Sequence, residues 1–488
     1  MKKVLLAVIG FAMLSGLLIG CGVPGAAGDE KENTNTIEND SVNESQGANA
    51  DTSQDVYENG LPKDEEVTLK YGFFEGGLGR DWVDNAIETF EEKYPNVTID
   101  ILASPDISQI LSTRISAGDD EEMFDLFNRN PSGGIVSLAE AGKLEPLDEI
   151  WDRPLPDADA TVKEMMMNGL FESVDRINGV SYQIPTSASV GGLFFNKKLF
   201  EEHDWNQNPQ NWEEFTALLE TIQADGITPI TFPGMYPSYH DWAFGDVESF
   251  EIADMSGNAE EHINNYQQFE GDVFTNPETL DRWEKIYALG QKGYFHEGLA
   301  ALSHTQSQMQ VLQGDVAMVS TGSHVENEMK NSAPADFEWG YMSVPFVDSN
   351  DQKNWVRQGT TNGHYIWAAK PDLNKAWAKE FIVWMLTLDV QEAAAEDGGA
   401  MPVRSDFIDD QDRYDTLQSS TKSVLSYINE NNVQLTKAYR SVAITHPSYE
   451  QAFKLRDEAI VNIFLGKVDP IPVLEEAETL IQEAISAQ

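Results

Sequence analysis

The chain has 488 residues and a formal net charge of −50 at pH 7. A surface this acidic repels nucleic acid and anionic lipid headgroups, so we expect no nucleic-acid partner. The length allows two or three domains with a large buried core. The sequence contains one cysteine, so disulfide bonds cannot contribute to stability.

That cysteine, Cys21, follows a leader typical of bacterial lipoproteins. Two lysines precede the apolar residues 4–18, and Leu18-Ile19-Gly20 stands directly before Cys21. The apolar stretch is too short and too interrupted by glycine for a good transmembrane helix. We therefore predict a signal peptide over residues 1–20 and a diacylglyceryl and palmitate anchor on Cys21. An ordinary secretory signal with a chance cysteine is the alternative.

Residues 21–60 are acidic, rich in Asn, Ser, Gly and Thr, and nearly free of large apolar side chains. Such a segment cannot bury enough surface to offset the entropy of ordering it. We predict a disordered tether that holds the folded part away from the membrane.

The folded part shows an alternation of strand and helix patterns from residue 67 onward. The period of the apolar residues predicts strands at 67–73, 97–102 and 124–127, with helices at 82–94 and 107–115 between them. Alternation with short connections is typical of a mainly parallel sheet flanked by helices, and ligands of such sheets bind at the carboxyl ends of strands.

A second α/β rhythm begins after residues 179–185. We expect strands at 191–195, 227–231 and within 313–320, and helices at 198–202, 212–224, 277–292, 375–388 and across most of 449–485. The last third is therefore predicted to be rich in helix.

Several short motifs occur in a characteristic order behind the lipoprotein leader. They are the stretch 88–99 (ETFEEKYPNVTI), Gly179-Val180-Ser181-Tyr182-Gln183-Ile184-Pro185, Leu193-Phe194-Phe195-Asn196-Lys197, Asn211-Trp212-Glu213-Glu214-Phe215, Asp225-Gly226-Ile227-Thr228-Pro229, the stretch 312–318 (LQGDVAM), the stretch 379–386 (KEFIVWML) and Gly399-Ala400-Met401-Pro402-Val403. Together they resemble the extracellular solute-binding lipoproteins of carbohydrate ABC importers.

The resemblance implies an α/β fold of the two-lobed, type II periplasmic-binding-protein-like kind. It implies a first lobe over 61–182 and 316–367, and a second lobe with C-terminal helices over 183–315 and 368–488. It also implies a monomer that binds a sugar or oligosaccharide between the lobes without catalysis or a cofactor and passes it to an ABC permease. The location expected is the extracellular face of the cell membrane, in a Gram-positive bacterium.

The segment from Met235 to Trp242 is the strongest sugar-site candidate, because sugars need flat aromatic surfaces together with polar groups. It follows a predicted strand and supplies Tyr236, Tyr239, His240, Asp241 and Trp242. The alternative is that Tyr236 and Trp242 pack in the lobe core, where most aromatic residues lie.

Other candidates follow predicted strands or occupy positions that the resemblance indicates. In the first lobe Glu75, Asn128 and Arg129 stand at strand ends, and Arg129 could instead pair with Glu75. Family position suggests Ser323, His324, Asn362, His364 and Arg404, and Tyr182 lies near the crossover. His324 stands where the family often has an aromatic residue, so an imidazole could replace a stacking ring.

Two other classes of function were weighed. A surface glycoside hydrolase needs two carboxylates, but among 82 acidic residues almost any pair can be imagined. A metal-import binding protein needs a ligand cluster, but the eight histidines are scattered and any cluster would have to form through the fold. We therefore expect no catalytic residues and no metal.

Overall fold

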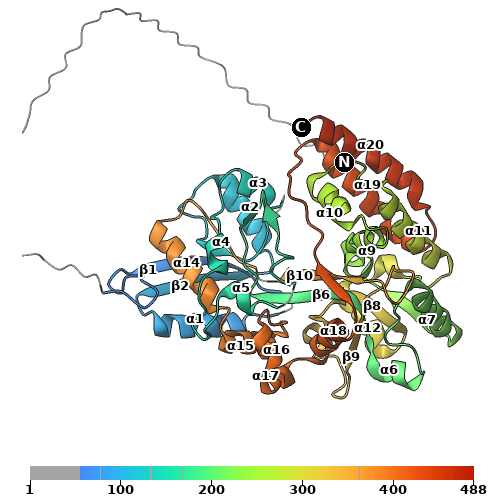
Figure 1. Ribbon diagram of the computed structural model, residues 1–488, viewed down its shortest axis with the longest axis horizontal. Helices are drawn as coiled ribbons and strands as arrows, with labels where there is room; N and C mark the ends of the chain where they lie inside the picture. The colour runs from blue at the N-terminus through green and yellow to red at the C-terminus, as the bar shows by residue number, and fades with distance from the viewer. Residues whose placement is uncertain (1–54, 77, 132–133, 168, 362) are drawn as a thin grey trace, which may run out of the picture. The chain divides into compact units, whose positions relative to one another are not determined.

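The computed structural model of the protein describes residues 55–488 apart from 77, 132–133, 168 and 362 (Figure 1). The predicted signal peptide, Cys21 and all but the last residues of the predicted tether lie outside the described residues. Residues Gln54–Gln488 form one unit, which holds two main β-sheets.

The first sheet has four strands in the order β11-β3-β1-β2. Strand β1 (Val67–Phe74) is parallel to β2 (Val97–Ser104) and β3 (Leu126–Phe127), and β11 (Tyr365–Ile366) runs antiparallel to β3. Alternate residues of β1 face opposite sides. Leu69, Tyr71 and Phe73 therefore join one core cluster.

Helices cover both faces of this sheet, and we call the sheet with its helices the first lobe. Phe381 of α14 (Asp372–Trp384) lies with its ring centroid 5.1 Å from Phe90 of α1 (Asp81–Lys93) and 5.9 Å from Tyr71. Helix α2 (Ile107–Ala117) buries Ile107 and Leu111 in a second cluster that also contains Phe127. The other elements grouped with this lobe are α3 (Val136–Glu140), α4 (Asp148–Trp151), α5 (Val162–Met165), the ribbon of β4 (Arg176–Ile177) and β5 (Val180–Ser181), α15 (Leu388–Gly398), α16 (Ser405–Asp409) and α17 (Gln411–Thr416).

The second sheet has six strands and is mixed rather than mainly parallel. Its order is β12-β10-β6-β8-β7, with β9 also paired to β6. Strand β6 (Ser187–Asn196) runs antiparallel to β8 (Val316–Gly322), β9 (Trp339–Met342) and β10 (Asn354–Thr361), whereas β7 (Thr228–Thr231) is parallel to β8 and β12 (Val433–Thr436) is parallel to β10.

The strand pairing corrects the expected division of the chain between the lobes. Residues 316–361 hold β8, β9 and β10 and belong to the second sheet, although the sequence analysis placed 316–367 in the first lobe. In contrast, α14 and α15 pack against α1, so the region after 368 begins in the first lobe. Apolar periodicity reports how a segment is buried but not which sheet buries it, and this is why the boundary was wrong.

The helices of the second lobe form where the sequence supplies both a cap and an apolar stripe. In α7 (Trp212–Ala224) the Asn211 Oδ1 accepts a hydrogen bond from the Glu214 N–H at 2.9 Å. Phe215, Leu218, Leu219 and Ile222 are buried at helical spacing. The chain then turns at Gly226, whose φ of +84° favours glycine.

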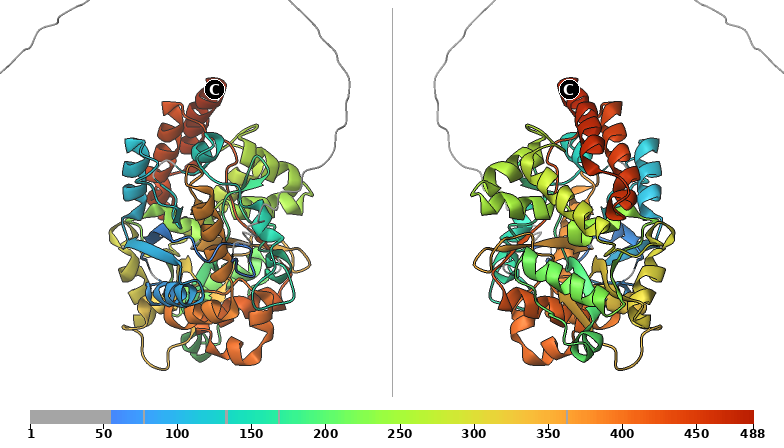
Figure 2. Two further views of the ribbon diagram at one scale, coloured as in Figure 1. Left: turned by 90° about the vertical axis from the view of Figure 1, so that its left-hand side faces the viewer. Right: turned by 90° about the vertical axis from the view of Figure 1, so that its right-hand side faces the viewer.

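The remaining helices of this lobe follow the second sheet and the C-terminal segment. They are α6 (Lys197–Glu202), η1 (Pro237–His240), α8 (Asp241–Phe244), α9 (Val247–Met255), α10 (Ala259–Gln268), α11 (Pro277–Gln291), η2 (Leu299–Ala301), α12 (His304–Gln313), α13 (Val325–Met329), α18 (Ser419–Glu430), α19 (Pro447–Phe464) and α20 (Pro470–Ser486). Helices α19 and α20 run side by side in every view (Figures 1 and 2). None of the described helices combines the length and apolar character needed to cross a membrane.

Within the described residues the chain passes between the two sheets three times. The first crossing joins β5 to β6, the second joins β10 to β11, and the third leads from α15 to α18. Ile184 and His364 form a bridge between the first two crossings, and Ala188 and Met401 form one between β6 and the third. The predicted crossover at 179–185 therefore lies where neighbouring crossings contact one another.

Candidate functional site

The segment from Met235 to Trp242, which we call the aromatic segment, leaves large apolar side chains in contact with water. Met235 is 55% exposed and Tyr236 is 49% exposed, although neither lies near a chain end. The segment follows β7 and forms the short helices η1 and α8. Neighbouring exposed apolar side chains are more typical of a binding surface than of the rest of a protein surface.

Trp242 is half-buried, and its ring lies on the second sheet where that sheet has glycines. A Cβ at Gly191 would come within 2.6 Å of the Trp242 carbonyl oxygen, and one at Gly322 within 2.8 Å of the indole Cζ3. The Arg357 guanidinium lies 4.6 Å from the indole centroid, and the His324 ring lies 5.4 Å away. The sheet therefore provides a fitted floor for this ring.

Arg129 of the first lobe and Tyr239 of the second lobe are near enough to affect each other's pKa. The exposed Arg129 follows β3, and its guanidinium lies 4.1 Å from the Phe74 ring centroid. Desolvation by the surrounding protein lowers the pKa of Arg129, and Tyr239 and Tyr365 oppose this effect. Burial, with a smaller contribution from Glu328, raises the pKa of Tyr239 to about 12. Candidates from both lobes thus approach each other here.

Of four further candidates, the structure describes three: Glu75, Asp241 and Tyr182. Glu75 is half-buried, and the ion pairs found among the described residues do not join it to Arg129. Asp241 is half-buried with its Oδ1 3.2 Å from His240 Nε2. Tyr182 packs against the cluster that holds Phe127 and Tyr365. Asn362 lies outside the described residues.

Five candidates are almost fully buried, and we call them the enclosed set: Asn128, His240, Ser323, His364 and Arg404. Asn128 Oδ1 accepts a hydrogen bond from the Phe74 N–H at 2.7 Å, and His364 Nε2 lies 2.6 Å from the Tyr71 hydroxyl. His240 Nδ1 lies 2.7 Å from the Pro237 carbonyl oxygen, and Ser323 Oγ accepts from the Val190 N–H at 3.4 Å. Their exposed fractions are 4% or less. These five side chains therefore bond within the protein, whereas the sequence predicted that they contact the ligand.

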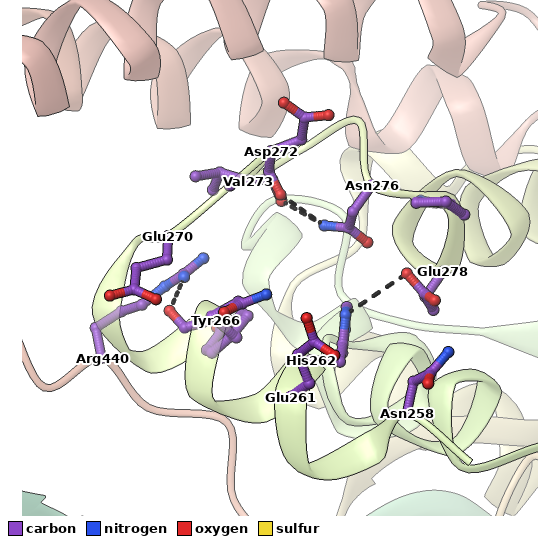
Figure 3. A pocket seen from close by; sticks show the side chains of 13 residues that line it. Asn258, Glu261, His262, Tyr266, Glu270, Asp272, Val273, Asn276, Glu278 and Arg440 are labelled. Atoms are coloured by element: carbon purple, nitrogen blue, oxygen red, sulfur yellow. Dashed lines mark hydrogen bonds and ion pairs between the residues drawn. The ribbon is translucent and has the colours of Figure 1, made fainter. Parts of the chain in front are cut away.

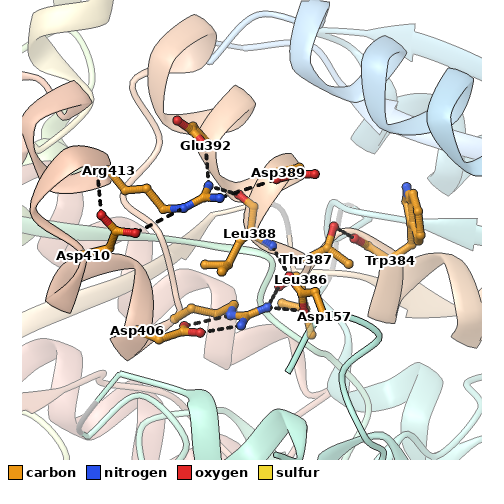
Figure 4. A network of polar contacts seen from close by, with 11 residues as sticks. Asp157, Trp384, Leu386, Thr387, Leu388, Asp389, Glu392, Asp406, Asp410 and Arg413 are labelled. Atoms are coloured by element: carbon orange, nitrogen blue, oxygen red, sulfur yellow. Dashed lines mark hydrogen bonds and ion pairs between the residues drawn. The ribbon is translucent and has the colours of Figure 1, made fainter. Parts of the chain in front are cut away.

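The polar atoms of Arg404 bond within the protein, and Figure 4 labels its partners Asp157, Leu386 and Asp406. Its side chain is fully buried and donates to Asp157 at 2.6 Å, to both Asp406 carboxylate oxygens at 2.9 and 2.5 Å, and to the Leu386 carbonyl at 3.1 Å. Neighbouring Arg413 binds Glu392 and approaches Asp389 and Asp410. A guanidinium satisfied in this way by carboxylates and a carbonyl has little capacity left for a ligand.

The sequence analysis missed four polar residues near the aromatic segment: His304, Gln308, Glu328 and Arg357. The His304 ring lies 4.8 Å from the Tyr239 ring, and Glu328 lies one helical turn after His324. The spacing of His324 and Glu328 could have predicted that their side chains are neighbours, since residues four apart lie on the same face of a helix. His304 and Arg357 come from α12 and β10, and no local pattern links them to the segment.

A polar pocket of about 280 Å³ lies elsewhere in the second lobe, between α10, α11 and the segment around Arg440 (Figure 3). Arg440 stacks on Tyr266, with its guanidinium carbon 3.5 Å from the ring centroid, and His262 lies 3.6 Å from Glu278. None of the residues predicted from the sequence lines it. It lacks the neighbouring rings of the aromatic segment, which therefore remains the better candidate for a sugar.

Two curated relatives cover most of this chain at low identity. The multiple sugar-binding protein of Streptococcus mutans is 22% identical over 385 residues, which are 78% of this chain and 84% of that protein. The diacetylchitobiose binding protein NgcE of Streptomyces coelicolor is 24% identical over 338 residues, which are 67% of each chain.

A solved structure shares the fold. The apo form of RafE from Streptococcus pneumoniae superimposes with a TM-score of 0.64 at 19% identity and covers 86% of this chain and 98% of that one. This likeness confirms the predicted α/β fold of the two-lobed, type II periplasmic-binding-protein-like kind.

The family assignment rests on more than half of the chain. Residues 76–392 match the family described as bacterial extracellular solute-binding protein. The matched span runs from the loop after β1 to α15 and includes the aromatic segment, Arg129 and every strand of the two main sheets except β1 and β12. The chain therefore belongs to the bacterial extracellular solute-binding proteins, a family of binding proteins rather than enzymes.

Proposed function

We propose that the protein captures a sugar or oligosaccharide between Arg129 and the aromatic segment and delivers it to an ABC permease. The observation that carries the proposal is the exposed Tyr236 beside the half-buried Tyr239 and Trp242, which face charged and polar neighbours. Flat rings pack on the C–H faces of a sugar, while polar groups bind its hydroxyls. The similarity to a multiple sugar-binding protein and to a diacetylchitobiose binding protein supports this class of ligand.

The proposed contacts are those candidates that keep free surface or lie beside it. They are Glu75, Arg129, Tyr182, Tyr236, Tyr239, Asp241, Trp242 and His324, with Arg357 added from the structure. The enclosed set would hold this surface in place from behind. Ligand bound to both lobes would favour a closed arrangement by its difference in affinity between the open and closed states.

The proposed setting is the outer face of the membrane. Cys21 would carry the lipid anchor, since its leader has the lipoprotein pattern and two acyl chains give stable attachment. The acidic residues after it would act as a tether, and a monomer would dock on the permease. A Gram-positive origin fits a lipid anchor as the means of retention outside the cell.

The test is isothermal titration calorimetry against a panel of mono- and oligosaccharides, with the recovered sugar analysed for product. Saturable one-to-one binding of an unchanged sugar is the expected result. Absence of binding to every sugar of the panel, or release of a hydrolysed product, would contradict the proposal. Mass spectrometry of the membrane fraction would show the diacylglyceryl group on Cys21, and its absence would contradict the anchor.

A further inference from the structure

The floor of the aromatic segment holds a cluster that the sequence does not bring together. His304 is the first residue of α12, His324 directly precedes α13, and Glu328 lies one turn further in α13. Each offers one ligand atom, and these atoms lie within 4.8 Å of one another. Among the described residues, this is the one group of three histidine and carboxylate side chains whose ligand atoms are close enough to share an ion.

The cluster contains a conflict between its hydrogen-bonding groups. His304 Nε2 lies 2.6 Å from Glu328 Oε2, and the Gln308 amide nitrogen lies 3.1 Å from the same imidazole nitrogen and 2.7 Å from the same carboxylate oxygen. If Nε2 carries a proton for Glu328, it cannot accept from the amide. If it carries none, its lone pair faces the carboxylate. In either tautomer, therefore, one of the three contacts is not a hydrogen bond.

Two buried polar atoms of the cluster also lack partners. Within the described part of the chain, neither Gln308 Oε1 nor His304 Nδ1 has a hydrogen-bond partner, and Gln308 is fully buried. Buried polar groups without partners are uncommon and call for an explanation. Rotating the amide by 180° would turn Gln308 Oε1 toward Glu328, which is favourable with a cation or a proton between the two oxygens.

We propose that His304, His324 and Glu328 bind a divalent transition-metal ion of the Zn²⁺ type beneath the aromatic segment. A cation accepts the lone pairs of both imidazoles and of the carboxylate at once, so it removes the conflict. Two imidazoles and one carboxylate suit Zn²⁺ and its first-row neighbours rather than Mg²⁺ or Ca²⁺, which prefer oxygen ligands.

The geometry requires only local adjustment. Tetrahedral ligands about 2.1 Å from Zn²⁺ lie about 3.4 Å apart. At present Glu328 Oε2 lies 2.6 Å from His304 Nε2 and Glu328 Oε1 lies 3.9 Å from His324 Nε2, and one ligand atom from each of the three side chains lies within 4.8 Å of the others. The three side chains are 16 to 23% exposed, which leaves an ion access to them.

The charge state of the cluster also favours a cation. Although burial opposes it, His324 and His304 hold the pKa of Glu328 below its usual value. Burial also lowers the pKa of His324, and Glu328 opposes this effect. The strongly acidic protein attracts cations in general.

The ion would connect the two rings of the aromatic segment. His304 contacts the Tyr239 ring and His324 contacts the Trp242 ring, at 4.8 and 5.4 Å between centroids. Fixing both imidazoles on one ion would therefore fix both aromatic platforms. Three protein ligands also leave a coordination position open to water or to a ligand hydroxyl.

The test uses the metal alone, so that it does not depend on the proposed sugar. The purified protein is stripped with EDTA, dialysed and titrated with ZnCl₂ in a calorimeter, and Co²⁺ is added in parallel for its visible absorption. We expect one ion per chain and a four-coordinate Co²⁺ spectrum. Absence of saturable binding by the wild type would overturn the proposal, and this outcome needs no variant to fold.

Variants locate the site. His304→Gln and Glu328→Gln each remove a ligand and should weaken Zn²⁺ binding by at least about tenfold. His203→Gln is the matched control, because His203 also pairs with a carboxylate, Asp225, at 3.2 Å but has no second histidine. Wild-type Zn²⁺ affinity in the double variant His304→Gln/Glu328→Gln would overturn the assignment.

Sugar titrations in EDTA and in Zn²⁺ separate this inference from the proposed function. Metal binding without any sugar binding would refute the sugar proposal alone. Sugar binding without metal binding would refute the metal site alone and would leave the cluster as part of the sugar surface.

Discussion

The aromatic segment and the enclosed set were predicted for the same role, yet the structure treats them differently. Tyr236 is half in water, whereas Arg404 is fully buried and bound to two carboxylates and a carbonyl. Folding normally buries large rings and exposes charges. The region that violates this rule is the one with spare surface for a ligand, while the region whose polar atoms are paired supports the fold. Variants of the first should change affinity, and variants of the second should change stability.

The largest effect is expected from Arg404→Ala. Removing one partner from a buried ion pair costs about 3–5 kcal/mol of unfolding free energy, because Asp157 and Asp406 lose their counter-charge. Urea denaturation would measure this, and sugar affinity of the folded protein should stay unchanged. Lys454→Ala is the control, since Lys454 and Glu458 form a pair that is 74% and 68% exposed and should cost little. Reduced affinity with normal stability would place Arg404 in the site after all.

Trp242→Ala tests the aromatic segment. If the indole stacks on a sugar, binding should weaken by about 1–3 kcal/mol, as it does for aromatic anchors at binding interfaces. Calorimetry with the best sugar of the panel measures this, and Tyr287→Ala, a half-buried ring of α11, should bind normally. Unchanged affinity with lowered stability would assign Trp242 to the core.

His364 gives the enclosed set a pH dependence. Burial lowers the pKa of His364 from 6.5 to about 3, so between these values the unfolded chain binds a proton that the folded chain does not. Unfolding free energy should therefore fall as pH drops below 6.5, by at most about 1.4 kcal/mol per pH unit from this group. His364→Gln should remove that part of the slope in urea denaturation at pH 7 to 5. An unchanged slope would contradict the assignment.

Tyr236→Ala should have the smallest effect on the fold. Because the ring is 49% exposed, unfolding free energy should change by less than about 0.5 kcal/mol. Sugar affinity should still fall measurably, by about 0.5–1 kcal/mol, if the ring touches ligand. A loss of stability without a loss of sugar affinity would show that Tyr236 supports the fold and does not bind ligand.

Local structure was largely predictable from the sequence because it depends on nearby residues. The helix predicted at 212–224 has those bounds, and the strand predicted at 67–73 is longer by one residue. Assignment of β8 and β10 to a sheet was not predictable, because their partner β6 lies more than 120 residues away.

The candidate site was predictable to a lesser degree. Strand ends indicated Asn128 and Arg129 correctly as neighbours of β3, but period and position do not say which side chain turns inward. Asn128 points to the Phe74 backbone while Arg129 remains exposed. The sequence predicted that any histidine cluster would have to form through the fold, and His304 and His324 indeed meet only after α12 and α13 have packed.

The three crossings between the sheets have a consequence for how the protein survives damage. A protease that cuts one crossing divides the chain into two fragments, and at least one of them still runs through both lobes. The nicked protein should therefore keep its ligand surface until denaturation separates the packed fragments. For a receptor displayed outside the cell, where proteases are common, this redundancy makes loss of one peptide bond tolerable.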